Sequence, residues 1–125
     1  MNKTKHLQFG QWAEKFACEF LKQKGLVLLQ QNYRSCYGEI DLIMRDRTVI
    51  VFVEVRSRSR KDFGLAVQSI NPHKVMKLIK TATHFLQVKK WMDTIQSRFD
   101  IVAIQSATGK IELEWIKNAF TTDRN

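Results

Sequence analysis

The sequence has too little cysteine for a disulfide framework. Its two cysteines, Cys18 and Cys36, lie far apart in the chain, and neither a CxxC motif nor a Cys/His spacing indicates a zinc site. A reducing compartment is the simpler inference, so we expect a cytoplasmic protein.

Long apolar runs are also lacking, and none approaches the length of a bilayer-spanning helix. The first residues, MNKTKHLQFG, are basic but lead into an amphipathic pattern without an apolar core or a small-residue cleavage site. We therefore expect neither a signal peptide nor a membrane partner. Repeats, low-complexity segments and convincing linkers are absent as well, so the 125 residues predict one domain over 1–125.

Positive charge is abundant. The chain has 21 Lys and Arg against 12 Asp and Glu, a formal net charge of +9. Its 44% hydrophobic and 26% charged residues are ordinary for a soluble globular protein. The charge favours a polyanionic partner, most simply nucleic acid, although a generally cationic protein is the alternative.

Periodic patterns predict two helices and five strands. The first helix has an apolar stripe, a second helix begins at an Asn71–Pro72 cap, and a strictly alternating segment near the C-terminus predicts an edge strand. The stripe of the first helix comprises Phe9, Trp12, Ala13, Phe16, Ala17, Phe20 and Leu21, before a Gly25 cap. The second helix repeats Val75, Leu78, Ile79, Ala82, Phe85 and Leu86, and strands are expected near 26–33, 39–44, 48–56, 99–105 and 111–116.

The resulting order is α-β-β-β-α-β-β. A long helix between the third and fourth strands permits a parallel crossover, so we expect an α/β fold with a mixed sheet of about five strands and helices packed on it. The segment 99–105 is nearly all apolar after Asp100, as expected for a strand covered on both faces.

Acidic residues stand inside two neighbouring strands, GEIDLI and VIVFVEVR. Side chains alternate along a strand, so Glu39 and Asp41 should share one face, and Ile40 and Leu42 the other. In a hairpin, Asp41 and Glu54 can come close together.

Two neighbouring carboxylates repel each other and carry a desolvation cost, unless a cation lies between them or basic groups pair with them. The alternative is an ordinary hairpin with one wet face, in which Glu54 pairs with Arg56 or another neighbour. For the whole arrangement we favour a functional site.

Other charged residues are candidates for the same site. Glu14 borders the stripe of the first helix, either as a solvated flank residue or as a ligand aimed at the sheet. Lys74 falls in the first turn of the second helix, where it either leans toward the sheet or remains a surface lysine. The segment 57–64 has three basic residues that either contact a phosphate backbone or form a solvated loop, namely Arg58, Arg60 and Lys61.

These residues carry a family resemblance. The arrangement resembles the PD-(D/E)xK nuclease plan in the form found in archaeal Holliday-junction resolvases. That plan has an acid in the first helix, an acid at the position of Asp41, and an acid at the position of Glu54 that is followed two residues later by a cation. The combination of GEIDLI, VFVEVR, Lys74, RFDIVAI and EWIKNAF resembles, over nearly the whole chain, the YraN family of uncharacterised, nuclease-like bacterial proteins.

The resemblance implies a restriction-endonuclease-like fold and hydrolysis of phosphodiester bonds dependent on Mg²⁺ or Mn²⁺. Asp41 and Glu54 would be the metal ligands, because hard oxygen donors suit magnesium, and Glu14 would support them from the helix. Glu39 is either a further ligand or a solvated acid, and Gln68 either orients a water or phosphate or is an ordinary polar residue. A resolvase-like role would favour DNA as partner and a homodimer.

Arg56 departs from the nuclease pattern, which usually has Lys at this position. Arginine can hold a phosphate but stays protonated, so it cannot act as a general base, and Lys74 is the candidate to supply an amine. A nucleic-acid-binding module with a vestigial nuclease site is therefore a second hypothesis. A protein-interaction domain is a third, and it leaves the clustered acids unexplained.

Overall fold

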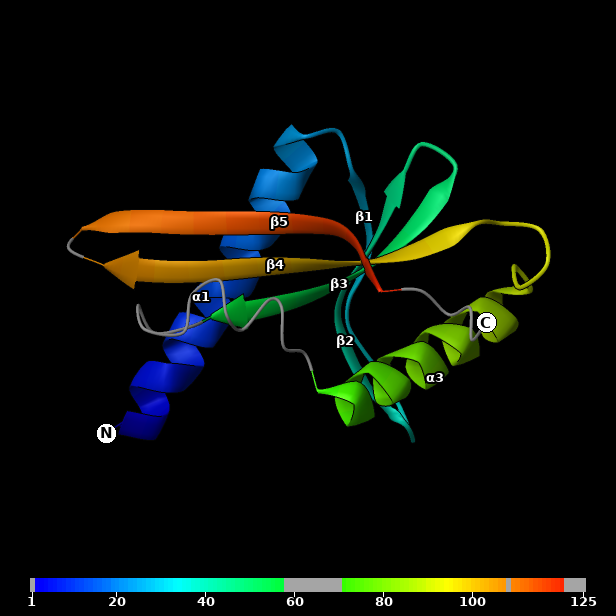
Figure 1. Cartoon of the computed structure of the whole chain (residues 1–125), viewed down its shortest axis with the longest axis horizontal. Helices are drawn as coiled ribbons and strands as arrows, with labels where there is room; N and C mark the ends of the chain where they lie inside the picture. Colours follow the sequence, from blue (N-terminus) through cyan, green and yellow to red (C-terminus); the bar gives the residue numbers. More distant parts are fainter. Residues whose placement is uncertain (1, 58–70, 108, 121–125) are drawn as a thin grey trace.

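A five-stranded mixed sheet forms the centre of the structure, with one helix on each of its faces (Figure 1). The computed structural model describes residues 2–57, 71–107 and 109–120. The elements within these residues are α1 (Asn2–Gln23), β1 (Val27–Ser35), β2 (Gly38–Asp46), β3 (Val49–Ser57), α3 (Pro72–Lys89), β4 (Ser97–Ala107) and β5 (Lys110–Phe120). The predicted fold class and element order are confirmed.

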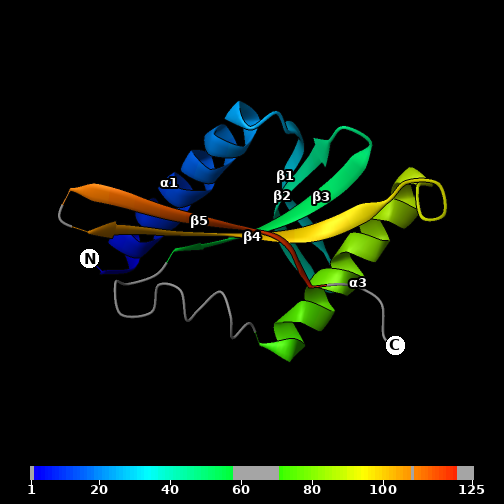
Figure 2. The same ribbon diagram turned by 45° about the horizontal axis from the view of Figure 1, so that its top comes forward.

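Strands lie in the sheet in the order in which they occur in the chain, β1-β2-β3-β4-β5. The first three are joined as antiparallel neighbours, β3 and β4 are parallel, and β5 returns antiparallel to β4 at the sheet edge. The parallel step is the predicted crossover through α3. The paired β4 and β5 extend beyond the other strands (Figure 2).

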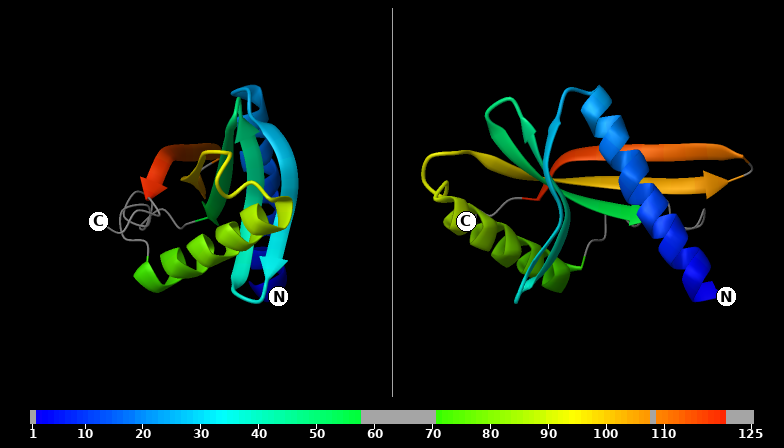
Figure 3. Two further views of the ribbon diagram at one scale, coloured as in Figure 1. Left: turned by 90° about the vertical axis from the view of Figure 1, so that its right-hand side faces the viewer. Right: turned by 180° about the vertical axis from the view of Figure 1, so that it is seen from behind.

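The sheet lies between α1 and α3 (Figure 3, left). An apolar core fills the space on each side of it. On the α1 side, small and aliphatic residues of the helix pack on β2, β3 and β4, and the buried members are Ala13, Ala17, Cys18, Leu21, Leu26, Leu42, Met44, Val51, Val53, Val102 and Ile104. On the α3 side the buried members are Ile40, Ile43, Ile50, Phe52, Leu78, Ala82, Phe85, Leu86 and Phe99. Residues 101–105 of β4 are buried throughout, so the predicted strand covered on both faces is confirmed.

The helix ends follow the capping signals in the sequence. The side chain of Asn71 accepts a hydrogen bond from the His73 N–H at 2.7 Å, and Pro72 opens α3. After α1, Gly25 has a φ of 99°, a left-handed conformation that glycine adopts without steric cost. The Asn71 cap fixes the first turn of α3, and with it the position of Lys74.

One residue of the predicted apolar stripe lies at the surface. Trp12 belongs to the apolar stripe of α1 but is 38% exposed and stacks between Phe9 and Phe16, with ring centroids 5.6 and 5.1 Å away. The helix meets the sheet through the small side chains of Ala13 and Ala17, so the buried part of the stripe is narrower than its apolar pattern. The larger rings are left on its flank.

In the part of the chain that the structure describes, neither helix has the length and apolar character needed to cross a membrane.

Candidate functional site

A hollow of about 340 Å³ opens where β2 and β3 separate, between α1 and the first turn of α3. Among the described residues, four with carboxyl groups and one lysine line it, so this part of its wall is mainly polar. The lining residues are Gly10, Ala13, Glu14, Glu39, Asp41, Glu54, Val55, Ser57 and Lys74. We refer to this hollow as the acidic site.

Asp41 lies where the hydrogen-bonded pairing of β2 with β3 stops. The last paired residues are Leu42 and Val53, and beyond them the Asp41 carboxylate accepts a hydrogen bond from the Val55 N–H at 2.8 Å. The side chain thus takes the place of a backbone acceptor. This bond holds one carboxylate oxygen of Asp41 at the strand ends.

The predicted alternation of β2 is wrong at this point. Ile40 packs in the α3-side core and Leu42 in the α1-side core, although they were expected to share a face. The regular two-residue period is therefore interrupted at Asp41. Across the β1–β2 ladder, the residue between the pairs Gln31–Leu42 and Tyr33–Ile40 is Asn32, which has a left-handed φ of 51°.

Glu54 enters the acidic site from β3 and is only 6% exposed. Its carboxylate forms an ion pair with Lys74, whose Nζ lies 2.5 Å from Oε2. The Lys74 side chain remains 49% exposed, so its ammonium group faces both the buried acid and the solvent. Of the two positions that the sequence left open for Lys74, the structure has the one that leans toward the sheet.

The carboxylates perturb one another. Burial raises the pKa of Asp41 to about 8, and the neighbouring charges of Glu54 and Glu14 add to this effect, while the Val55 N–H opposes it. Burial, followed by the charges of Glu39 and Glu54, also raises the pKa of Glu14. The carboxylates are therefore crowded enough to favour their protonated forms, and a bound cation would relieve this repulsion.

The structure brings only some of the predicted site residues together. Glu14, Glu39 and Lys74 line the acidic site with Asp41 and Glu54, and Glu39 also accepts a hydrogen bond from the Arg34 Nε at 2.5 Å. Arg58, Arg60, Lys61 and Gln68 lie outside the described residues.

Arg56 is half-buried and lies level with Ala103 of the parallel strand β4. The lining of the acidic site includes its neighbours Val55 and Ser57 but not Arg56 itself. Among the described lining residues, the amine therefore comes from helix α3, through Lys74, and not from the position that Arg56 occupies.

The donor set fits a magnesium ion. Within residues 2–57, 71–107 and 109–120, no group of three or more His, Cys, Asp or Glu side chains is arranged to hold a metal. Magnesium, however, is commonly held by one or two carboxylates together with waters and substrate phosphates. Asp41 and Glu54 supply that number of hard oxygen ligands.

We expect Asp41→Asn to stabilise the metal-free protein at neutral and mildly alkaline pH. The folded pKa of about 8 lies above the ordinary 3.8, so between these values the folded protein keeps a proton that the unfolded chain releases. Asp41 therefore makes stability fall as the pH rises through this range. Asparagine still accepts the Val55 N–H without a charge, and the gain at pH 7 should be on the order of a few kcal/mol, since each pH unit between the two pKa values contributes about 1.4 kcal/mol.

Thermal unfolding in EDTA from mildly acidic to mildly alkaline pH measures this effect. The wild type should lose more stability than the variant as the pH rises, whereas the exposed substitution Asp93→Asn should follow the wild type. Parallel curves for wild type and Asp41→Asn would contradict the prediction.

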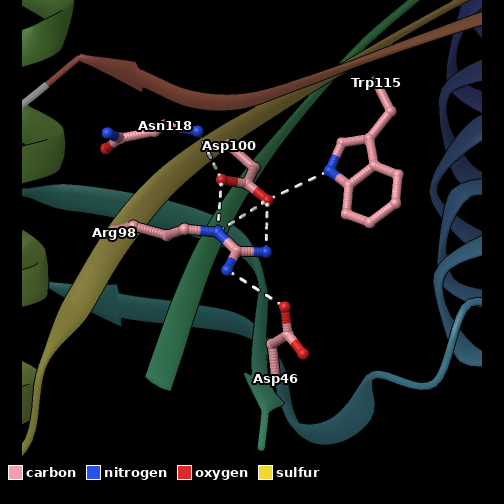
Figure 4. A network of polar contacts seen from close by, with 5 residues as sticks. All are labelled: Asp46, Arg98, Asp100, Trp115 and Asn118. Carbon is pink, nitrogen blue, oxygen red and sulfur yellow. Dashed lines mark hydrogen bonds and ion pairs between the residues drawn. The ribbon is translucent and has the colours of Figure 1, made fainter.

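A second polar cluster, which the sequence did not predict, includes Asp46 at the other end of β2 (Figure 4). Asp100 of β4 is 1% exposed and accepts hydrogen bonds from the Arg98 Nε at 3.0 Å, the Trp115 Nε1 at 3.0 Å and the Asn118 N–H at 2.9 Å. Arg98 also donates to Asp46 at 3.0 Å. The available signal was an opposite-charge pair two residues apart in an apolar strand, since such residues share a face.

The fold and the acidic site together define an α/β protein with paired carboxylates at the diverging ends of two antiparallel strands. Uncharacterised protein family UPF0102 matches residues 13–104, a range that contains Glu14, Asp41, Glu54 and Lys74. The chain belongs to this family, which is the YraN family that the sequence motifs indicated.

Similar proteins cover almost the whole chain. A UPF0102 protein of Nitrosococcus oceani is 42% identical over 123 residues, 98% of this chain and 99% of the relative. One from Legionella pneumophila is 45% identical over 111 residues, 89% of this chain and 92% of the relative. One from Coxiella burnetii is 46% identical over 111 residues, 89% of this chain and 90% of the relative.

Proposed function

We propose that this protein is a metal-dependent nuclease that hydrolyses phosphodiester bonds in nucleic acid, with Asp41 and Glu54 holding Mg²⁺ or Mn²⁺. The observation that carries the proposal is the convergence of these two carboxylates beside the Lys74 ammonium in one open hollow. The net charge of +9 supports a polyanionic substrate.

Each side chain has a role that its surroundings support. A bound divalent ion would supply Lewis-acid polarisation of the phosphate and a lower pKa for a coordinated water. Asp41 is oriented for binding by the Val55 N–H. Lys74 offsets negative charge beside Glu54 and presents N–H donors to a phosphate oxygen.

The arrangement resembles the PD-(D/E)xK plan with one change in the source of the cation. Arg56 stands at the usual lysine position of the strand, and Lys74 of α3 is the amine that lines the acidic site. We therefore assign the charge-offsetting role to Lys74. Glu14 supports the site from α1, where it also lines the hollow.

The direct test is cleavage of end-labelled DNA by the purified protein. Branched, flap, single-stranded and linear duplex substrates, with RNA counterparts, are incubated in EDTA, Mg²⁺ or Mn²⁺. We expect cleavage of at least one substrate with a divalent ion and none in EDTA. Intact substrates under all these conditions would overturn the proposal.

We expect Lys74→Gln to slow cleavage by about 10- to 100-fold, the usual cost of removing a group that supports a metal site. Binding of the same DNA in EDTA should change by less than about 3-fold, because one exposed lysine contributes a single phosphate contact. Lys110→Gln, at an exposed position in β5, is the control and should change neither quantity. If binding and cleavage fell by the same factor, Lys74 would contribute only to binding the phosphate backbone, and its proposed role beside the metal would be wrong.

A nucleic-acid-binding module without cleavage is the second candidate. The observation that favours it is the ion pair of Lys74 with Glu54, which already offsets one of the two carboxylates that a metal would need. This candidate predicts strongly salt-dependent binding of nucleic acid in EDTA and no cleavage after a divalent ion is added.

A further inference from the structure

Two further hollows follow the exposed side of α3 away from the acidic site. The first, of about 320 Å³, shares Glu39 and Lys74 with the acidic site, and its lining is Gly38, Glu39, Asn71, His73, Lys74, Lys77 and Leu78. The second, of about 430 Å³, is lined by Tyr37, Ile79, Lys80, Thr83, His84 and Gln87. We refer to these two neighbouring hollows together as the α3 groove; residues of α3 and of the β1–β2 hairpin line both.

The α3 groove has the charge of a phosphate-binding surface. Helix α3 contains no acidic residue between Pro72 and Lys89, and Lys77 and Lys80 are exposed along it. Among the described lining residues, the acid is Glu39, which lies at the end shared with the acidic site and is paired with Arg34. Positive charge therefore continues from Lys74 along the helix.

An aromatic ring lies beside these lysines. Tyr37 in the β1–β2 turn is 46% exposed, and the Lys80 Nζ lies 6.0 Å from the centre of its ring. An exposed ring next to cationic side chains is the usual platform for the bases of single-stranded nucleic acid, because every base has a π-face to stack. A duplex keeps its bases stacked on one another and has no face to offer Tyr37.

The turn that carries Tyr37 is attached to the helix. The Ser35 hydroxyl donates to the Thr81 hydroxyl at 3.4 Å and accepts the Tyr37 N–H at 3.1 Å. At Gly38 the backbone comes so close that an added Cβ would lie 3.4 Å from the Thr81 hydroxyl. The ring is thus held beside the groove before a ligand arrives, which lowers the entropy cost of binding.

We propose that the α3 groove binds an unpaired stretch of nucleic acid, with phosphates on Lys77 and Lys80 and a base stacked on Tyr37. From Lys74 to Gln87 the helix rises by about 20 Å, enough for a few nucleotides. A second part of the inference rests on the proposed nuclease function. If the protein cleaves nucleic acid, the groove guides the unpaired strand to the acidic site, so substrates with a single-stranded portion, such as flaps and forks, are cut in preference to intact duplex.

The test is binding of a short fluorescent single strand and its matching duplex in EDTA, followed by anisotropy at several salt concentrations. The wild type should bind the single strand more tightly. The double variant Lys77→Gln/Lys80→Gln should weaken binding by at least about 10-fold and reduce the slope of log affinity against log salt by about 1.4, or 0.7 per lost phosphate contact.

Tyr37→Leu should weaken binding by about 5- to 100-fold and leave the salt slope unchanged, because stacking releases no counterions. Lys89→Gln, in the last turn of the same helix but outside the groove lining, is the matched control and should bind as the wild type does. Circular dichroism spectra of all variants establish that they are folded.

These results separate the groove from the nuclease. Binding that depends on Lys77, Lys80 and Tyr37 without divalent-dependent cleavage supports the groove and overturns the proposed function. Cleavage by variants that still bind the single strand as tightly as the wild type overturns the groove and leaves the nuclease intact. Tighter binding of duplex than of single strand, or no binding by the wild type, also overturns the groove.

Discussion

Asp41→Asn is expected to lower the rate of divalent-dependent cleavage by at least about 100-fold. Replacing a group that only supports a metal ligand commonly costs 10- to 100-fold, so replacing the ligand itself should cost more. Asparagine keeps the size of the side chain and an oxygen acceptor for the Val55 N–H, which lies 2.8 Å from the carboxylate in the wild type. The change therefore removes the charge that binds the metal and preserves the strand geometry.

Single-turnover cleavage of the labelled DNA in Mg²⁺ measures this loss, and binding of the same DNA in EDTA should be unchanged or slightly tighter. Glu112→Gln, on the exposed part of β5, is a carboxylate control that should cleave as the wild type does. The variant should also be more stable than the wild type without metal, so lost activity cannot be explained by unfolding. Cleavage within about 3-fold of wild type would remove Asp41 from the metal site.

Asp100→Ala is expected to reduce the free energy of unfolding by about 3–5 kcal/mol, the usual cost of breaking a buried ion pair on one side. The Asp100 carboxylate is fully buried and holds Arg98, while the Trp115 indole and the Asn118 backbone donate to it as well. Without it, these partly buried donors lose their acceptor. Asp46 alone would remain to pair with Arg98.

Urea unfolding followed by tryptophan fluorescence and circular dichroism measures the loss. Asp93→Asn, an exposed substitution in the turn before β4, should change stability by less than about 0.5 kcal/mol. The loss of stability in Asp100→Asn should lie between those of Asp93→Asn and Asp100→Ala, because the amide oxygen still accepts some of the hydrogen bonds. A loss below about 1 kcal/mol for Asp100→Ala would show that the cluster contributes little to the fold.

Much of the fold could be predicted because its signals are local. The apolar spacing of α1 and α3, the Asn71 cap and the alternation of β5 each depend on neighbours a few residues away. The length of α3 also decided the parallel pairing of β3 with β4, since only a long connection returns a strand in the same direction.

The candidate site could be predicted only in part. Asp41 and Glu54 were identified because burying an acid inside a strand costs free energy unless a cation pairs with it. The interruption of β2 at Asp41 was not visible, since nothing in the residues around it marks where the pairing with β3 ends. The exposure of Trp12 was not visible for a similar reason: an apolar stripe shows which side of a helix is buried, but the packing partner decides how wide the buried side is.

Local patterns in the sequence were enough to predict the element order, the mixed sheet and the basic character of the chain. They also identified Asp41 and Glu54, which line the acidic site. The tertiary structure alone decided which distant groups meet: Lys74 with Glu54, Asp100 with Arg98 and Trp115, and Tyr37 with Lys80. The difference lies in how far apart in the chain the interacting residues are. Helix and strand patterns arise from interactions between near neighbours in the chain, whereas these contacts depend on how the helices lie across a twisted sheet, a result of packing both cores at once.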